Sequence, residues 1–199
     1  MSQFWDEKFS RDGFTYGTRP NQYLALQREL FAGGGAALVP GDGEGRNGIW
    51  LAEQGLQVCS VDSSKVGQGK ARKLADARGV AVDFQLVDLL SWQWPAGRFD
   101  FIASIFFHLH SKDRPRIHAA MISALKPGGW LVLEAFRPQQ LGLTSGGPKD
   151  LDLLYGADIL AKDFAAAEIV ELADVECLLD EGPLHQGVAR TTRLLARKG

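Results

Sequence analysis

The fold is decided by the stretch Ala37-Leu38-Val39-Pro40-Gly41-Asp42-Gly43-Glu44-Gly45-Arg46-Asn47, followed after nine residues by Gln57-Val58-Cys59-Ser60-Val61-Asp62. The two apolar runs predict buried strands, and the residues between them predict a turn and a helix. Glycines let a ligand approach the main chain closely, and the helix that follows offers unpaired N–H groups. An acid at the tip of the second strand can bind ribose hydroxyls. The stretch therefore predicts a nucleotide-type site.

Composition indicates a single globular domain, residues 1–199, with residues 1–20 as an N-terminal cover of the site. The chain has 199 residues, of which 45% are hydrophobic and 23% are charged. This length is sufficient to bury a substantial core. The formal net charge of −2 argues against a nucleic-acid partner, because binding many phosphates needs a basic excess.

The cysteines and the N-terminus point to a cytoplasmic protein with reduced thiols. Cys59 and Cys177 lie far apart without a C-x-x-C spacing, so each is expected to be a small buried hydrophobe rather than a disulfide partner or metal ligand. The first residues contain no apolar core of signal-peptide length, and no later segment has the length and apolar character of a membrane span. We expect no membrane partner and a monomer.

Strands alternate with helices along the chain. The pattern predicts a Rossmann-like, doubly wound α/β sheet of seven mostly parallel strands with an antiparallel C-terminal hairpin. The expected strands are 36–40, 57–62, 80–87, 99–106, 130–136, 168–179 and 185–197. The expected helices are 21–31 with Asn21 as N-cap, 46–54, 63–77 with Ser63 as N-cap, 111–125 and 158–165.

The glycine loop by itself fits two ligands. Gly43 to Gly48 reads G-x-G-x-x-G, and Asp62 follows at a distance suited to a dinucleotide site. Gly41 adds a further glycine upstream, which gives G-x-G-x-G, a tighter turn around a more compact ligand. A short-chain dehydrogenase would also need a Tyr-x-x-x-Lys pair, and no tyrosine here has lysine four positions later.

Five features, in order along the sequence, resemble the class I S-adenosylmethionine-dependent methyltransferases over nearly the whole chain. Gly41-Asp42-Gly43-Glu44-Gly45 matches their cofactor loop, Asp62 their ribose-binding acid and Asp88 the residue that reads the adenine amino group. Phe99-Asp100-Phe101-Ile102-Ala103 and Leu125-Lys126-Pro127-Gly128-Gly129 match the signatures of strand four and of the turn before strand five. The resemblance implies S-adenosyl-L-methionine as the cofactor.

Within that class, the chain resembles the branch related to tellurite-resistance and thiopurine methyltransferases. The matching residues are Trp5-Asp6-Glu7-Lys8-Phe9, Tyr16-Gly17, Pro20-Asn21 and Gly45-Arg46-Asn47. The resemblance implies methyl transfer to a small-molecule acceptor, a soft chalcogen or thiol nucleophile. Its implied cofactor-binding residues are Gly41, Gly43, Gly45, Arg46, Asp62, Ser63, Asp88, Leu89, Phe106 and Tyr16.

The chain departs from the class at Val39, where an acid usually supports the loop, and we expect Asp42 or Glu44 to compensate. Arg46 has two interpretations. Either it adds a charge-assisted bond to the carboxylate of the ligand at the start of its helix, or it is a solvent-facing helix residue.

Three residues are the catalytic candidates. His108 follows strand 99–106, at the edge where methyltransferases present acceptor-side groups, and His185 resembles a histidine that faces the active site in tellurite-type enzymes. Arg190, with Arg193, can attract an anionic substrate. His108 and His110 have no nearby cysteine or acid in the sequence, so no metal site is predicted. The segment 144–150 is expected to form a lid.

Three functions stay open at this point. The first is a small-molecule methyltransferase, because the Asn/Asp-Pro-Pro-Tyr/Phe motif of nucleic-acid amine methyltransferases is replaced by Ser104-Ile105-Phe106-Phe107. The second is a non-catalytic module that binds S-adenosylmethionine. The third is an NAD(P)-dependent reductase.

Overall fold

A seven-stranded mixed sheet forms the centre of the protein, of which the computed structural model describes residues 2–199. The strand order is β3-β2-β1-β4-β5-β7-β6, with β7 antiparallel to both of its neighbours and the other pairs parallel. The predicted Rossmann-like fold is confirmed. The strands are β1 (Ala36–Pro40), β2 (Gln57–Asp62), β3 (Asp83–Leu86), β4 (Phe99–Ile105), β5 (Leu125–Phe136), β6 (Glu168–Asp180) and β7 (Gln186–Arg197).

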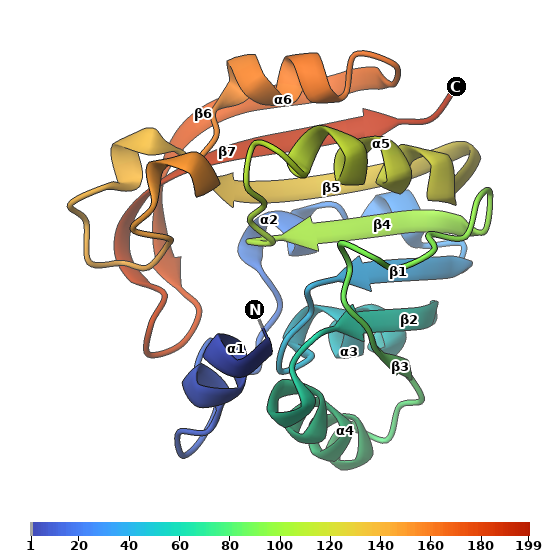
Figure 1. Ribbon diagram of the computed structural model, residues 1–199. Coiled ribbons are helices and arrows are strands. Elements are labelled where there is room, and N and C mark those ends of the chain that lie inside the picture. The colour runs from blue at the N-terminus through green and yellow to red at the C-terminus, as the bar shows by residue number, and fades with distance from the viewer. Residues whose placement is uncertain (1) are drawn as a thin grey trace.

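Helices cover both faces of the sheet, with α5 and α6 on one face and α2 and α3 on the other (Figure 1). Among residues 2–199, none of the helices has both the length and the apolar character needed to cross a membrane. The α-helices are α1 (Ser2–Phe9), α2 (Gln22–Leu26), α3 (Arg46–Glu53), α4 (Lys65–Arg78), α5 (Arg114–Ala124) and α6 (Ala157–Asp163). The 3₁₀ helices are η1 (Arg28–Phe31), η2 (Pro138–Gln140) and η3 (Leu151–Leu153).

Alternate residues of β1 show why its sequence is apolar throughout. Leu38 packs in the core cluster that contains Ile117 of α5, whereas Val39 packs in the opposite cluster with Leu24 and Leu51. A strand that is buried on both faces needs apolar side chains at successive positions. The hydrophobic run therefore places β1 at the centre of the sheet, and its carboxyl end carries the glycine loop.

The end of α2 and the start of α4 differ from the sequence predictions. Asn21 caps α2 as predicted, and its Oδ1 accepts the N–H of Leu24 at 2.9 Å, but the α-helix ends at Leu26 and continues as the 3₁₀ turn η1. Ser63 is not the cap of α4. The N-cap is Ser64, whose hydroxyl accepts the N–H of Gly67 at 2.9 Å.

Three further boundaries need correction. The third strand is shorter than the predicted 80–87, since only residues 83–86 pair with β2. Helix α5 begins at Arg114 rather than near 111, because residues 111–113 form a turn. Strand β5 begins at Leu125, five residues before the predicted start at 130, because Leu125 already pairs with Phe99 before an irregularity in the register.

Candidate active site

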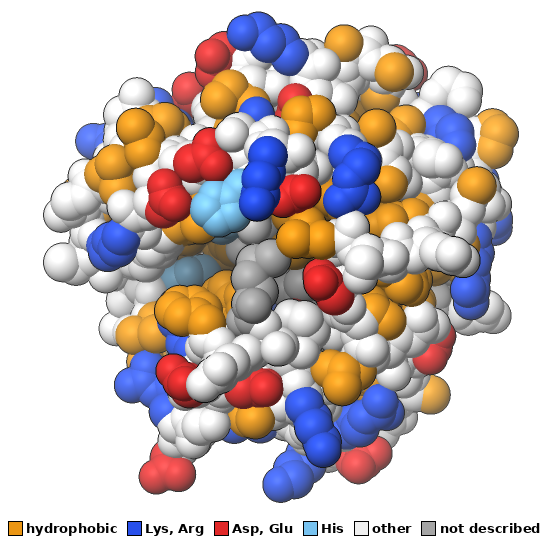
Figure 2. Space-filling view, viewed as in Figure 1, with side chains coloured by type: hydrophobic (Ala, Val, Ile, Leu, Met, Phe, Trp, Pro, Cys, Tyr) orange, Lys and Arg blue, Asp and Glu red, His pale blue; other side chains and the backbone are white. Residues whose placement is uncertain are grey.

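The glycine loop and two of the predicted site residues, Asp62 and Phe106, lie at the carboxyl edge of the parallel strands. The glycine loop follows β1, Asp62 ends β2, Phe106 follows β4 and Phe136 ends β5. Open α/β sheets bind ligands at this edge, beside the point where the strand order reverses. Here that point lies between β1 and β4. Figure 2 shows a hollow in the molecular surface at this edge, with histidine and hydrophobic side chains at its margin.

The loop Gly41–Gly45 is shaped so that side chains would not fit in it. Gly41 and Gly43 have φ angles of 67° and 57°, in the left-handed region that favours glycine. A Cβ on Gly41 would lie 2.6 Å from the ring of Phe107, and one on Gly43 would lie 2.9 Å from the ring of Phe9. The loop therefore turns tightly and presents bare main chain to its surroundings.

Asp62 joins the glycine loop to the start of α4. Its carboxylate accepts the N–H of Gly43 at 2.8 Å and the N–H of Ser64 at 2.7 Å, and the residue is only 7% exposed. Burial raises the pKa of Asp62, although the main-chain N–H groups act in the opposite direction. An acid held at this edge by main-chain donors is positioned to accept further hydrogen bonds, and its ribose-binding role stays a prediction.

Asp42, rather than position 39, braces the loop. Its carboxylate accepts the hydroxyl of Ser60 at 2.8 Å and the N–H of Gly48 at 3.2 Å. Burial raises the pKa of Asp42 to about 6. Val39 is 1% exposed and packs in the core, where an acid would lack solvent. Of the two residues expected to support the loop, Asp42 makes these hydrogen bonds to Ser60 and Gly48. Glu44 instead accepts the N–H of Thr15, in the N-terminal segment, at 2.7 Å.

Arg46 is buried, so the interpretation as a solvent-facing residue is wrong. Its guanidinium donates to Oε2 of Glu181 at 2.7 Å, and the two side chains are 7% and 1% exposed. Burial opposes ionisation of Glu181, but the contacts with His185 and Arg46 and the N–H of Gln22 outweigh it and hold the pKa of Glu181 at about 2. The pair ties the start of α3 to the turn between β6 and β7.

Asn21 extends this pair into a buried polar network that the sequence analysis missed. Its amide nitrogen donates to Glu134 at 2.7 Å and to Glu181 at 2.9 Å. Glu134, near the end of β5, also accepts the hydroxyl of Thr191 at 2.9 Å and the guanidinium of Arg193 at 2.8 Å. These partners are 57 to 160 residues apart, so no local pattern could have revealed them.

His185 lies in an aromatic cluster, defined here as Tyr16, Phe106, Phe136 and His185. Its ring centroid is 4.3 Å from that of Tyr16, 4.7 Å from Phe106 and 5.4 Å from Phe136. Phe106 has a φ of 51°, the one positive value at a non-glycine position among residues 2–199. Backbone strain of this kind costs on the order of 1–3 kcal/mol and concentrates at functional sites. Here it places the Phe106 ring 4.5 Å from that of Phe136, stacked on it.

His108 stands beside the cluster as a neutral ring with both nitrogens engaged. Nδ1 lies 2.6 Å from the carbonyl oxygen of Leu153, so it carries the proton, and Nε2 accepts the N–H of Phe136 at 3.4 Å. Burial lowers the pKa of His108 to about 4. These contacts join the end of η3 to the end of β5, and the role of His108 as a catalytic group stays a prediction.

Other predicted residues lie away from the cluster or are engaged elsewhere. Arg190 forms an ion pair with Glu176 across the β6–β7 hairpin. Asp88 is exposed after β3 and accepts the N–H of Leu90 at 3.1 Å. Leu89 is 5% exposed and packs in the core, and Ser63 is half-buried between Asp62 and the cap of α4. Within residues 2–199, no three metal-ligating side chains gather.

The two segments expected to cover the site both contact it. Ring atoms of Phe9 lie against Gly43 and Gly67, and Asp6 accepts the hydroxyl of Ser64 at 2.6 Å. In the segment 144–150, Gly146 packs on His185 so closely that a Cβ would lie 2.6 Å from the imidazole ring.

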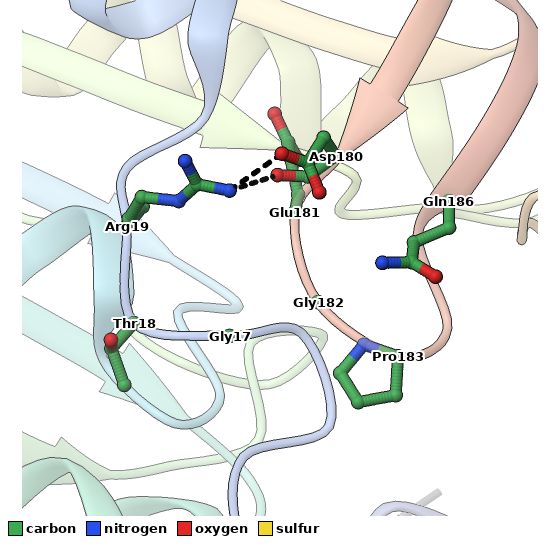
Figure 3. A pocket seen from close by; sticks show the side chains of 8 residues that line it. All are labelled: Gly17, Thr18, Arg19, Asp180, Glu181, Gly182, Pro183 and Gln186. Atoms are coloured by element: carbon green, nitrogen blue, oxygen red, sulfur yellow. Dashed lines mark hydrogen bonds and ion pairs between the residues drawn. The ribbon is translucent and has the colours of Figure 1, made fainter.

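A separate cavity of about 490 Å³ lies outside the aromatic cluster, between the N-terminal segment and the β6–β7 turn (Figure 3). Its walls include Gly17, Gly182 and Pro183, and the side chain of Arg19 crosses it to Asp180 at 2.8 Å. This ion pair is exposed, in contrast to the buried pair between Arg46 and Glu181 beside it.

The sheet order, the antiparallel last strand and the glycine turn define the Rossmann-like methyltransferase fold. Residues 37–129 match the model of a family described as a methyltransferase domain. Over these residues, just under half of the chain, the protein is therefore similar to a methyltransferase domain.

Curated relatives match parts of the chain. It is 31% identical over 102 residues to a demethylmenaquinone methyltransferase of Thermus thermophilus, covering 50% of this chain and 46% of the relative. It is 32% identical over 118 residues to a probable thiol methyltransferase 2 of Arabidopsis thaliana, covering 57% and 50%. It is 32% identical over 139 residues to a tRNA 5-carboxymethoxyuridine methyltransferase of Escherichia coli, covering 64% and 52%. The chain thus spans about half the length of these relatives.

Solved structures match nearly the whole chain in fold. One, concerned with the conversion of a disulfide bond into a thioacetal group during echinomycin biosynthesis, gives a TM-score of 0.79 at 19% identity, covering 99% of this chain and 89% of that chain. TehB from Haemophilus influenzae gives 0.74 at 17%, covering 100% and 67%. The N-methyltransferase NodS from Bradyrhizobium japonicum, in complex with S-adenosyl-L-homocysteine, gives 0.73 at 18%, covering 99% and 97%.

Proposed function

We propose that the protein is an S-adenosylmethionine-dependent methyltransferase that acts on a small molecule with a soft nucleophile, a thiol or a chalcogen oxyanion. The observation that carries this proposal is the position of the glycine loop and Asp62 on the same sheet edge as the aromatic cluster. One half offers main chain without side chains and a buried acid, and the other half offers a group of aromatic side chains for an acceptor.

The residues of the glycine loop fit the cofactor. Gly41 and Gly43 carry no side chains, so the main chain of the loop can contact a ligand directly. Asp62 accepts the ribose hydroxyls. When bound, the cofactor supplies a methyl group on a cationic sulfur. The chain's part is to hold the acceptor in line with that methyl group, and such orientation is worth on the order of 7–11 kcal/mol. Segments 1–20 and 144–150 exclude water from the site.

The neighbourhood of His185 supports a soft acceptor. Burial lowers the pKa of His185 as it does that of His108, so both rings are neutral near pH 7. A neutral imidazole with a lowered pKa is a weak base, so it gives little help in removing the proton of an alcohol or of an ammonium group. A thiol is more acidic than an alcohol, and an ionised chalcogen carries its negative charge already, so these acceptors need less basic assistance. The similarity to a thiol methyltransferase and the shared fold with TehB agree with this choice.

Methyl transfer from a labelled donor tests the proposal. We expect label to appear on a simple thiol, selenite, tellurite or a thiopurine, and to be lost when Asp62 is replaced by Ala. Unfractionated tRNA serves as the opposing substrate, because one relative acts on tRNA. Label on tRNA, with none on the small acceptors, would contradict the small-molecule proposal.

A further inference from the structure

Glu181 occupies the point where three parts of the candidate site meet. Its Oε2 accepts the guanidinium of Arg46, which opens the helix after the glycine loop, at 2.7 Å. Its Oε1 accepts the side chain of Asn21 at 2.9 Å and the N–H of Gln22 at 3.0 Å. The residue is 2% exposed and follows the end of β6. Every one of these partners is a donor, so the carboxylate is held in its ionised form.

The fourth neighbour of Glu181 is His185, four residues later in the same turn. Nδ1 of His185 lies 3.8 Å from Oε2 of Glu181. This nitrogen is buried and has no hydrogen-bond partner among the described residues. A buried polar atom without a partner is costly, and the carboxylate of Glu181 is the hydrogen-bond acceptor that lies beside this nitrogen. The geometry therefore directs Nδ1 toward the carboxylate.

We propose that Glu181 is a positioning residue that keeps the proton of His185 on Nδ1 and leaves the lone pair of Nε2 to accept a hydrogen bond from an S–H or O–H group of the acceptor. The inference rests on the proposed function and names the acceptor-side contact of that site. Glu181 then has two roles: it pairs with Arg46, and it sets which nitrogen of His185 carries the proton.

The charges around His185 keep its ring neutral, so what remains to be decided is which of its two nitrogens carries the single proton. Burial and the positive charges of Arg46 on α3 and Lys8 on α1 disfavour a second proton on the ring. Of the neighbours named here, Glu181 alone favours a second proton. His108 and Tyr16, which complete the surroundings, are neutral near pH 7. A neutral imidazole has one N–H, and an anion beside Nδ1 attracts it to that nitrogen.

The tautomer of His185 can be measured directly. In protein labelled with ¹⁵N-histidine, long-range ¹H–¹⁵N spectra distinguish protonated from unprotonated ring nitrogens, and a His185→Gln variant assigns the signal among the four histidines of the chain. We expect an excess of at least about tenfold for the Nδ1–H form in the wild-type protein at pH 7. A wild-type ring protonated on Nε2 would overturn the inference.

Two variants separate positioning from structural support. Glu181→Gln keeps the shape of the side chain but removes the negative charge beside Nδ1, so the excess of the Nδ1–H form is expected to be lost. Glu181→Asp keeps the charge and is expected to keep the proton on Nδ1. Asp180→Asn, in the same turn but in the exposed pair with Arg19, is the matched control and leaves the spectrum unchanged (Figure 3). An unchanged tautomer in folded Glu181→Gln contradicts the inference.

The outcomes distinguish this inference from the proposed function. If calorimetry shows no binding of S-adenosylhomocysteine to the wild-type protein, the proposed function fails whatever the tautomer. If the wild-type protein binds that ligand but carries the His185 proton on Nε2, only the role of Glu181 fails. Should Glu181→Gln not fold, the wild-type spectrum still decides.

Discussion

The two halves of the candidate site are held together in different ways. In the cofactor half, formed by the loop Gly41–Gly45 and Asp62, the carboxylates of Asp42 and Asp62 accept hydrogen bonds from main-chain and side-chain groups no more than 19 residues away. In the acceptor half, formed by the ends of β4, β5 and β7 and the turn 180–185, Glu134 and Glu181 contact Asn21 and Arg46 from 113 to 160 residues away. The first half is a local motif, and the second exists only when the chain is folded.

This difference predicts where each half is vulnerable. Changes in the local motif are expected to act mainly on ligand binding, because its loop geometry is encoded by glycines and short-range contacts. Changes in the acceptor half are expected to act first on stability, because its charges are buried and mutually dependent. The predictions below test this contrast, beginning with the largest expected effect.

Arg46→Met should be the most destabilising of these substitutions. It leaves Glu181, with a side chain 1% exposed, without its cationic partner. Removing one partner of a buried ion pair costs about 3–5 kcal/mol. Chemical denaturation, followed by circular dichroism, measures this loss.

Arg19→Met supplies the control for that measurement. Arg19 pairs with the adjacent Asp180, but these side chains are 71% and 61% exposed. Exposed pairs contribute about 0–1 kcal/mol, so the variant should unfold close to the wild-type midpoint. If the two arginine variants lost equal free energies of unfolding, the buried pair would be no more important for stability than the exposed pair.

Asp62→Ala should weaken binding of S-adenosylhomocysteine about 10- to 150-fold, since a lost hydrogen bond to a charged group costs about 1.5–3 kcal/mol. Isothermal titration calorimetry measures the change. The matched control is Asp83→Ala, an exposed acid on the neighbouring strand β3. If Asp62→Ala binds as tightly as the control, Asp62 does not bind the ribose.

Asp42→Asn should change how stability depends on pH. The folded-state pKa of Asp42 is raised by burial to about 6, above the ordinary value of 3.8, so the folded protein binds more protons than the unfolded chain between these values. Its contribution to stability is therefore lost as pH rises through about 6. The stability of the variant relative to wild type should increase by roughly 2 kcal/mol from pH 4 to pH 7. A constant difference across this range would contradict the raised pKa.

Asp88→Ala should have the smallest effect. The residue is exposed, so water competes with its predicted partner, the adenine amino group, for the carboxylate and weakens the hydrogen bond between them. A hydrogen bond of this kind contributes about 0.5–1.5 kcal/mol, which corresponds to about 2- to 12-fold in affinity. Comparing S-adenosylhomocysteine with its inosyl analogue, which lacks the amino group, isolates this contact. The variant should discriminate less between the two ligands than the wild-type protein does.

Local sequence patterns were sufficient for much of the fold. The bounds of β1 and β2 agree with the structure, because a short apolar run ending in a glycine or an acid has little freedom to shift. The cap of α4 was misplaced by one residue, since Ser63 and Ser64 are chemically identical and only the turn after Asp62 decides between them.

The acceptor half could be predicted only in fragments. His185 and Phe106 were identified by resemblance, but nothing in the sequence joins Glu181 to Arg46, Asn21 to Glu134, or Tyr16 to His185. These contacts depend on how the N-terminal segment packs against the β6–β7 turn. The main chain of Gly17 packs directly against that turn: a Cβ on Gly17 would lie 3.2 Å from the carbonyl oxygen of Glu181.

The central claim is that the glycine loop and Asp62 hold a sulfonium nucleoside rather than a pyrophosphate. The most direct measurement is calorimetric titration of the wild-type protein with S-adenosylmethionine, S-adenosylhomocysteine and NAD⁺ under one set of conditions. We expect saturable heats with the first two ligands and none with NAD⁺. Saturable binding of NAD⁺, with no heat from either sulfur nucleoside, would contradict the account.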